Sequence, residues 1–175
     1  MYRVLSLFVC LALVLLAFTV VIPPTQAAAI VPGTVPPSSF ALAADIEEQV
    51  FQAINRIREE NHLAPLSAAK DLGSVARLHS EDMATRDYFS HVSPEGDSLG
   101  KRATRNGVTN WNRIAENIAM NCGYSNPATI AVKGWLESPA HRHNILDQNL
   151  TETGIGVAVD AKGRIFLTQL FARRK

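Results

Sequence analysis

The segment GIGVAVDAKGRIFLTQLF, residues 154–171, gives the clearest indication of the fold. Residues 154–159 and 165–171 are largely apolar, as is typical of short buried strands. Between them, Asp160-Ala161-Lys162-Gly163 has the composition of a tight turn. We therefore expect an antiparallel hairpin here, with a third strand over residues 114–120.

Helices are predicted before this hairpin and between the strands. Asp45 is suited to cap a helix that ends near Asn61, because apolar residues follow it at spacings of three and four. A second helix is expected to start at Ser67 and to end near Arg86. Asn126-Pro127 predicts the start of a third helix. In the same way, Ser138-Pro139 ends that helix and begins a short fourth one.

Helices that alternate with antiparallel strands, each with one apolar side, pack against both faces of a single sheet. The predicted fold class is α/β (α+β), an α-β-α sandwich with a small central antiparallel sheet flanked by helices.

The chain is predicted to have three parts. Residues 1–29 are expected to be a signal peptide or an N-terminal anchor, because Arg3 precedes an uncharged and mostly apolar run over 4–22. The length of this run permits either cleavage or retention in a bilayer. Residues 30–43 form a Pro-rich tether, and residues 44–175 form one folded domain. We expect a protein of the cell exterior or cell envelope that meets a membrane only through its first segment, if that segment is uncleaved.

Charge and cysteine content narrow the function classes. The chain has 17 Lys and Arg against 16 Asp and Glu, which argues against nucleic-acid binding. Cys10 lies in the apolar leader, so the folded domain holds Cys122 alone and cannot form an internal disulfide. The chain lacks a phosphate-binding Gly loop, a nucleophile elbow and a His-Glu-x-x-His helix. The familiar catalytic motifs are therefore absent. We also expect the domain to be a monomer.

Four side chains are the candidate site residues: His91, Glu116, Glu137 and His141. Glu116 interrupts an apolar strand, so its carboxylate requires either a partner or an outward orientation. Glu137 and His141 lie on either side of a helix break, where they either face one cleft or act as caps and surface residues. The spacing leaves both alternatives open for each of these three residues, and His91, which is predicted to lie in a loop, is as readily a solvated or hydrogen-bonded residue as a ligand. His79 lies on the apolar side of its helix and is expected to be a hydrogen-bonded core histidine.

Several blocks of sequence resemble the bacterial branch of the CAP superfamily (cysteine-rich secretory, antigen 5 and pathogenesis-related proteins). The blocks are ARLHSEDMA at 76–84, YFSHVSPEG at 88–96, AENIA at 115–119, GWLESPAHRHNIL at 134–146 and GIGVA at 154–158. The resemblance spans about residues 45–172. It implies an α-β-α sandwich with a concave cleft, lined by two His and two Glu that hold a divalent metal in some members.

In this resemblance, His91, Glu116 and Glu137 match three positions of this set of two His and two Glu, which we call the tetrad. Eukaryotic members carry a second His where this chain has Phe166, and His141 is the candidate to replace it. His91 and His141 are then the expected metal ligands, with zinc as the best-suited ion.

The function that we expect from these features is binding of a small apolar, lipid or cell-surface ligand in this cleft, without established catalysis. The alternative is a metal-dependent extracellular hydrolase or protease in which Glu116 or Glu137 is the general base. A third possibility is that the cluster only braces the loops over the sheet.

Overall fold

The computed structural model describes residues 39–175. The predicted signal peptide and residues 30–38 of the predicted tether lie outside them. The elements in chain order are α1 (Ser39–Glu60), β1 (Ser67–Ala68), α2 (Lys70–Arg86), α3 (Leu99–Arg105), β2 (Trp111–Cys122), α4 (Pro127–Glu137), α5 (Pro139–Leu146), β3 (Glu152–Val159) and β4 (Arg164–Arg174). No helix of residues 39–175 is long and apolar enough to cross a bilayer.

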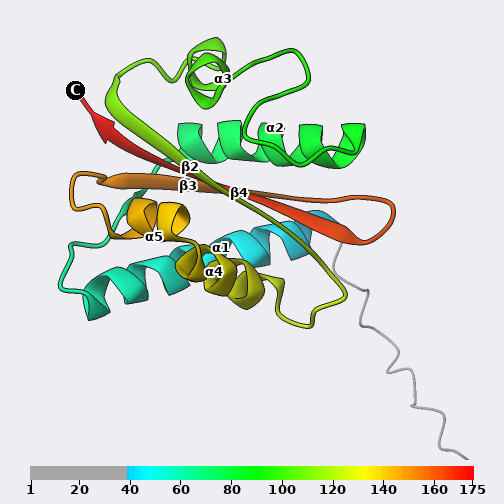
Figure 1. Cartoon of the computed structure of the whole chain (residues 1–175), viewed down its shortest axis with the longest axis horizontal. Helices are drawn as coiled ribbons and strands as arrows, with labels where there is room; N and C mark the ends of the chain where they lie inside the picture. The colour runs from blue at the N-terminus through cyan, green and yellow to red at the C-terminus, as the bar shows by residue number, and fades with distance from the viewer. Residues whose placement is uncertain (1–38) are drawn as a thin grey trace, which may run out of the picture. The chain divides into compact units, whose positions relative to one another are not determined.

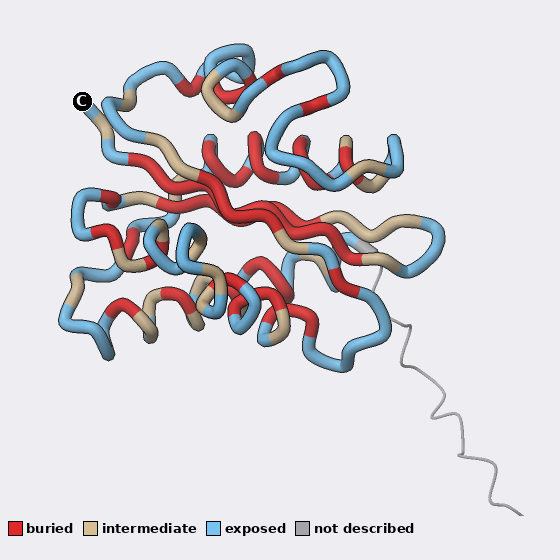
Figure 2. Tube along the Cα trace, in the orientation of Figure 1, coloured by how far each residue is buried: buried red, intermediate tan, exposed pale blue. Residues whose placement is uncertain are grey.

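These elements form three layers around one four-stranded sheet of order β1-β3-β4-β2 (Figure 1). Helices α2 and α3 lie on one face of the sheet, and α1, α4 and α5 lie on the other. The most buried parts of the chain are the central strands and the helix sides that face them (Figure 2). The predicted α-β-α sandwich is confirmed.

The hairpin between β3 and β4 forms as the sequence predicts. Asp160 Oδ1 accepts hydrogen bonds from the backbone N–H groups of Lys162 and Arg164, both at 2.9 Å. Gly163 supplies the positive φ of +75° that the turn needs. Strand β2 then pairs with β4 along its whole length, from Trp111 to Cys122, which is longer than predicted.

Helix α2 lies unusually close to β3 because two glycines remove the side chains between them. A Cβ on Gly154 would lie 2.1 Å from the backbone N of Gly73, and a Cβ on Gly156 would lie 2.0 Å from that of Arg77. Ser80 on α2 then donates a hydrogen bond of 2.9 Å to the carbonyl oxygen of Gly156. The two glycines fix α2 on the sheet and so fix the loop that follows α2.

The structure corrects the predicted start of the second helix. Ser67 does not begin a helix; it lies in β1, a two-residue strand that pairs in parallel with β3. The backbone N–H groups of Ser67 and Ala69 donate to the carbonyls of Thr151 and Thr153, so the chain is extended until Lys70. The sheet is therefore mixed, although its three long strands are antiparallel.

The first helix also begins earlier than predicted. Asp45 lies inside α1, where its carboxylate accepts a hydrogen bond from Gln49 one turn later at 2.7 Å. Helix α3 was not predicted. The Asn126-Pro127 start of α4 is confirmed, because Asn126 Oδ1 accepts a hydrogen bond from the backbone N–H of Thr129.

Candidate functional site

The candidate site lies along the free edge of β2, where the two helical layers meet. Strand β2 is the last strand of the sheet, so one row of its backbone groups has no strand beside it. Two side chains from the α4–α5 layer cover this edge. Trp135 Nε1 donates to the carbonyl oxygen of Ile118 at 2.8 Å, and Asn144 Nδ2 donates to that of Glu116 at 3.3 Å. These bonds protect the edge strand and hold α5 beside Glu116.

The Glu116 carboxylate is buried, with only 3% of its side chain exposed, and both of its oxygens have partners. Oε1 lies 2.8 Å from Nδ1 of His91, and Oε2 accepts a hydrogen bond of 2.5 Å from Nη2 of Arg102. His79 Nε2 lies 4.0 Å from the same Oε2 atom. Of the two alternatives that the sequence left open, Glu116 has the partnered orientation, in which Arg102 offsets the cost of burying its charge.

Arg102 is a member of the cluster that the sequence analysis missed. It lies on α3 and is almost buried, and its Nη1 donates to the carbonyl oxygens of His91 at 2.7 Å and of Asp97 at 3.0 Å. One guanidinium thus joins the loop after α2 to the Glu116 carboxylate on β2. In the sequence, the signal that could have indicated such a residue is Glu116 itself, because a buried carboxylate requires a cation near it. No helix is predicted at 99–105, so the sequence does not place Arg102 near β2.

His91 and His141 lie beside each other at this edge, one from each helical layer. Their ring centroids are 6.0 Å apart. Nδ1 of His91 is engaged by Glu116, which leaves Nε2 free on a side chain that is half exposed. Among residues 39–175, the ring nitrogens of His141 have no hydrogen-bond partner. Burial lowers the pKa of His141, and the neighbouring His91 lowers it further, so its imidazole is neutral and its lone pair is available near pH 7.

Glu137 does not join this cluster, contrary to the predicted tetrad. Its side chain is 67% exposed, and its ionic partner is Lys133 at 3.9 Å on the same helix. The reason is helical geometry: Trp135 faces the core of the domain, and a residue two positions later lies about 200° around the helix axis. The structure therefore brings together His91, Glu116 and His141 of the four candidates, and adds Arg102.

The donor set limits what metal site the cluster can form. No group of three or more His, Cys, Asp or Glu within residues 39–175 is arranged to hold a metal ion. Two imidazoles on one tetrahedral zinc would have ring centroids about 5 Å apart, given Zn–N bonds of about 2.1 Å. The observed 6.0 Å is close to this separation, and Glu116 already orients His91 from behind, as carboxylates do for zinc-bound histidines. His91 and His141 are therefore close enough to share a metal ion, which would have these two imidazoles as its protein ligands and open positions for other groups.

His79 has the buried, hydrogen-bonded position expected from its helix. It is 1% exposed, and its Nε2 lies 3.1 Å from the carbonyl oxygen of Ser90. Because a carbonyl only accepts, Nε2 carries the proton. Burial lowers the pKa of His79. Together with Arg102, His79 lines a cavity of about 240 Å³ under the loop after α2, which His91 and His141 do not line. The paired imidazoles lie on the outer side of the cluster.

Comparison with known proteins places the domain in a family. The model of the cysteine-rich secretory protein family, CAP, matches residues 51–171. The chain is 39% identical over 128 residues to the Bacillus subtilis protein YlbC, described as an uncharacterized membrane protein; the match covers 73% of this chain and 34% of YlbC. It is 36% identical over 110 residues to the uncharacterized protein YkwD of the same organism, which covers 63% of this chain and 41% of YkwD. The match therefore spans less than half of either relative.

A solved structure shows the same fold at similar identity. It is a Bacillus anthracis protein described as extracellular and containing a SCP domain. It is 34% identical, with a TM-score of 0.70, and the match covers 81% of this chain and 44% of that one. The fold, the order of the sequence blocks and these matches agree, and the protein belongs to the cysteine-rich secretory protein (CAP) family.

Proposed function

We propose that this CAP domain is an exported binding domain whose ligand site is the pair of imidazoles, His91 and His141, at the free edge of β2. The observation that carries the proposal is the arrangement of these rings, 6.0 Å apart, with His91 held from behind by a carboxylate that is itself fully paired. His91 is fixed in direction with Nε2 free, and the ring nitrogens of the neighbouring His141 have no partner among residues 39–175, so the pair is suited to bind a metal or a polar group of a ligand.

A divalent metal, with zinc the best suited, would be held by Nε2 of His91 and a ring nitrogen of His141. The metal would supply positive charge and open coordination positions for a ligand. Glu116 keeps the His91 ring in one orientation, and its bond to Nδ1 makes Nε2 the free nitrogen. Arg102 neutralises Glu116, so the carboxylate does not compete for the metal.

The surface beside His91 favours a ligand with an apolar part. Phe89 and Val92 lie within two residues of His91 in the loop, and they are 47% and 46% exposed. A small apolar or lipid molecule, or an apolar group on a cell-surface partner, would cover these side chains while its polar end meets the imidazoles. Export is supported by the apolar N-terminal sequence and by the extracellular relative from Bacillus anthracis.

The geometry supports binding better than metal-dependent hydrolysis. A general base must reach the water that it activates. Both oxygens of Glu116 are bonded to His91 and Arg102, and Glu137 pairs with Lys133 away from the imidazoles. Neither carboxylate is placed to act as that base.

Zinc titration by calorimetry tests the proposal, with the protein purified without a His tag. The wild type is expected to bind one zinc ion, and the His91→Ala/His141→Ala variant is expected to lose that site. The matched control, His62→Asn/His143→Ala, removes two exposed histidines and should bind zinc as the wild type does. Absence of binding by the wild type, or equal binding by the His91/His141 double variant, would contradict the proposal.

A further inference from the structure

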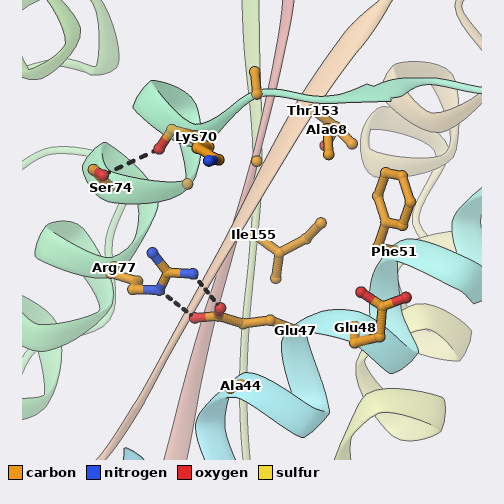
Figure 3. Close-up of a pocket in the computed structure, with 13 residues that line it drawn as sticks. Ala44, Glu47, Glu48, Phe51, Ala68, Lys70, Ser74, Arg77, Thr153 and Ile155 are labelled. Atoms are coloured by element: carbon orange, nitrogen blue, oxygen red, sulfur yellow. Dashed lines mark hydrogen bonds and ion pairs between the residues drawn. The ribbon is translucent and has the colours of Figure 1, made fainter.

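A groove of about 600 Å³ lies at the other edge of the sheet, between α1 and α2 (Figure 3). This volume falls within the range of about 300–1,000 Å³ that is typical of ligand sites. Beyond the end of β1, the edge of β3 forms the base of the groove, and Ile155 is one of the residues that line it. None of its lining residues belongs to the His91–Glu116–His141 cluster.

The edge of β3 in this groove is only partly paired. β1 pairs with Glu152 and Thr153 alone, and the carbonyl oxygen of Thr153 accepts from the N–H of Ala69 at 2.8 Å. Further along, the N–H of Val157 donates to Oε1 of Glu47 at 3.1 Å. Backbone groups of alternate residues point to the same edge of a strand, so the N–H and C=O of Ile155 also point into the groove. Within residues 39–175, no strand and no side chain supplies their partner.

The two edges of the sheet therefore differ. At β2, Trp135 and Asn144 donate to the carbonyl oxygens of Ile118 and Glu116, and helices α4 and α5 pack beside this edge. At β3, the N–H and C=O of Ile155, a residue that lines the groove, have no partner among residues 39–175, and an extended peptide added as a strand would supply one.

The walls of the groove give it a pattern of charge. Arg77 and Glu47 neutralise each other through bonds of 2.8 and 2.5 Å. Lys70 on the α2 side has no ion-pair partner within the described part of the chain. Glu48 on the α1 side has only the amide of Gln52 as a partner. Figure 3 shows Lys70 and the apolar ring of Phe51 on opposite sides of the groove.

We propose that this groove binds an extended peptide segment of another protein, which adds to β3 as a strand at Ile155. The segment would place an acidic side chain against Lys70 and a basic side chain against Glu48, with apolar or β-branched side chains against Phe51. A second copy of this chain is a less suitable partner, because α1 and α2 would flank the β3 edge in both copies.

The test uses the full chain and one probe peptide, acetyl-Glu-Val-Thr-Val-Thr-Lys-amide. Amide hydrogen exchange by NMR is the direct readout, because a strand bonded to Ile155 must protect its N–H. We expect exchange of the Ile155 amide to slow by about tenfold or more at saturation, with a dissociation constant no weaker than about 1 mM. N-methylation of alternate peptide residues provides the backbone test: one set faces β3 and should abolish binding, whereas the other faces solvent and should not.

Variants of the protein provide the second arm. Gly73 lies on the α2 wall, and a Cβ there would lie 3.6 Å from the carbonyl oxygen of Ile155, an ordinary contact. Gly73→Leu should therefore fold and block the groove. Gly134→Leu is the matched control, since it adds the same side chain to a helix at a position with nothing within 4 Å. Lys70→Glu should weaken binding of the probe peptide and strengthen binding of a peptide that has Lys in place of Glu.

Three results would overturn the proposal: no change at Ile155 up to about 1 mM peptide, equal binding of both N-methylated peptides, or equal binding by Gly73→Leu and Gly134→Leu. Zinc binding at His91 and His141 should be unchanged in Gly73→Leu, so the two proposals succeed or fail separately.

Discussion

Replacing Glu116 by Gln tests the paired carboxylate on which the site is built. The change keeps the size of the side chain and removes its charge, which leaves the guanidinium of Arg102 buried without its anion. Removing one partner of a buried ion pair costs about 3–5 kcal/mol. Arg102 keeps its two carbonyl acceptors, and the amide oxygen of Gln can still accept one hydrogen bond. We therefore expect a loss of about 2–4 kcal/mol in the free energy of unfolding.

Urea denaturation measures this loss. With a slope of about 2 kcal/mol per M, a loss of 3 kcal/mol lowers the midpoint by about 1.5 M. Glu137→Gln is the matched control, because it makes the same chemical change on an exposed side chain and should cost less than about 0.5 kcal/mol. Equal midpoints for Glu116→Gln and Glu137→Gln would refute the claim that the buried pair stabilises the site.

Three further predictions concern the scaffold. Gly156→Ala should cost about 3 kcal/mol or more in thermal unfolding, because its Cβ would lie 2.0 Å from the N atom of Arg77; a fully stable variant would contradict the close α2–β3 contact. Arg58→Met should cost about 2–4 kcal/mol in urea, because it leaves buried carbonyls such as that of Ile145 without their donor; an unchanged midpoint would contradict this. Burial lowers the pKa of His79, so the unfolded chain takes up protons first and stability should fall as the pH drops below 6.5. In the His79→Gln variant, the urea midpoint should change less between pH 7 and pH 5 than it does in the wild type. If the pH dependence of the midpoint is the same in both proteins, groups other than His79 cause it.

The parts of the fold that depend on local sequence could be predicted. The β3–β4 hairpin follows from two apolar runs around a turn, and the start of α4 follows from Asn126-Pro127. Each signal lies within a few residues of the structure that it specifies, so spacing and side-chain chemistry suffice.

The parts that depend on distant contacts could not be predicted. Ser67 has the side chain of a helix cap, but its backbone pairs with β3, far along the chain. Arg58 follows the polar pattern of its helix, yet it is 1% exposed, and carbonyls of α5 and of the α5–β3 connection accept its hydrogen bonds. The sequence around Ser67 and around Arg58 does not indicate partners that lie so far along the chain.

The candidate site shows the same division. His91, Glu116 and His141 could be selected from their residue types and from the family resemblance. The exclusion of Glu137 required the direction of its helix face, and the inclusion of Arg102 required the position of α3 above β2.

In the proposed site, His91 and His141 bind the ligand together, and Glu116 fixes the direction of His91. Long-range ¹H–¹⁵N NMR of the imidazoles during a zinc titration tests it most directly, because the nitrogen shifts report both protonation and metal coordination. We expect the signals of Nε2 of His91 and of one nitrogen of His141 to shift together at one equivalent of zinc, while Nδ1 of His91 keeps its proton toward Glu116. Zinc-induced shifts at other histidines with none at this pair, or coordination through Nδ1 of His91, would contradict it.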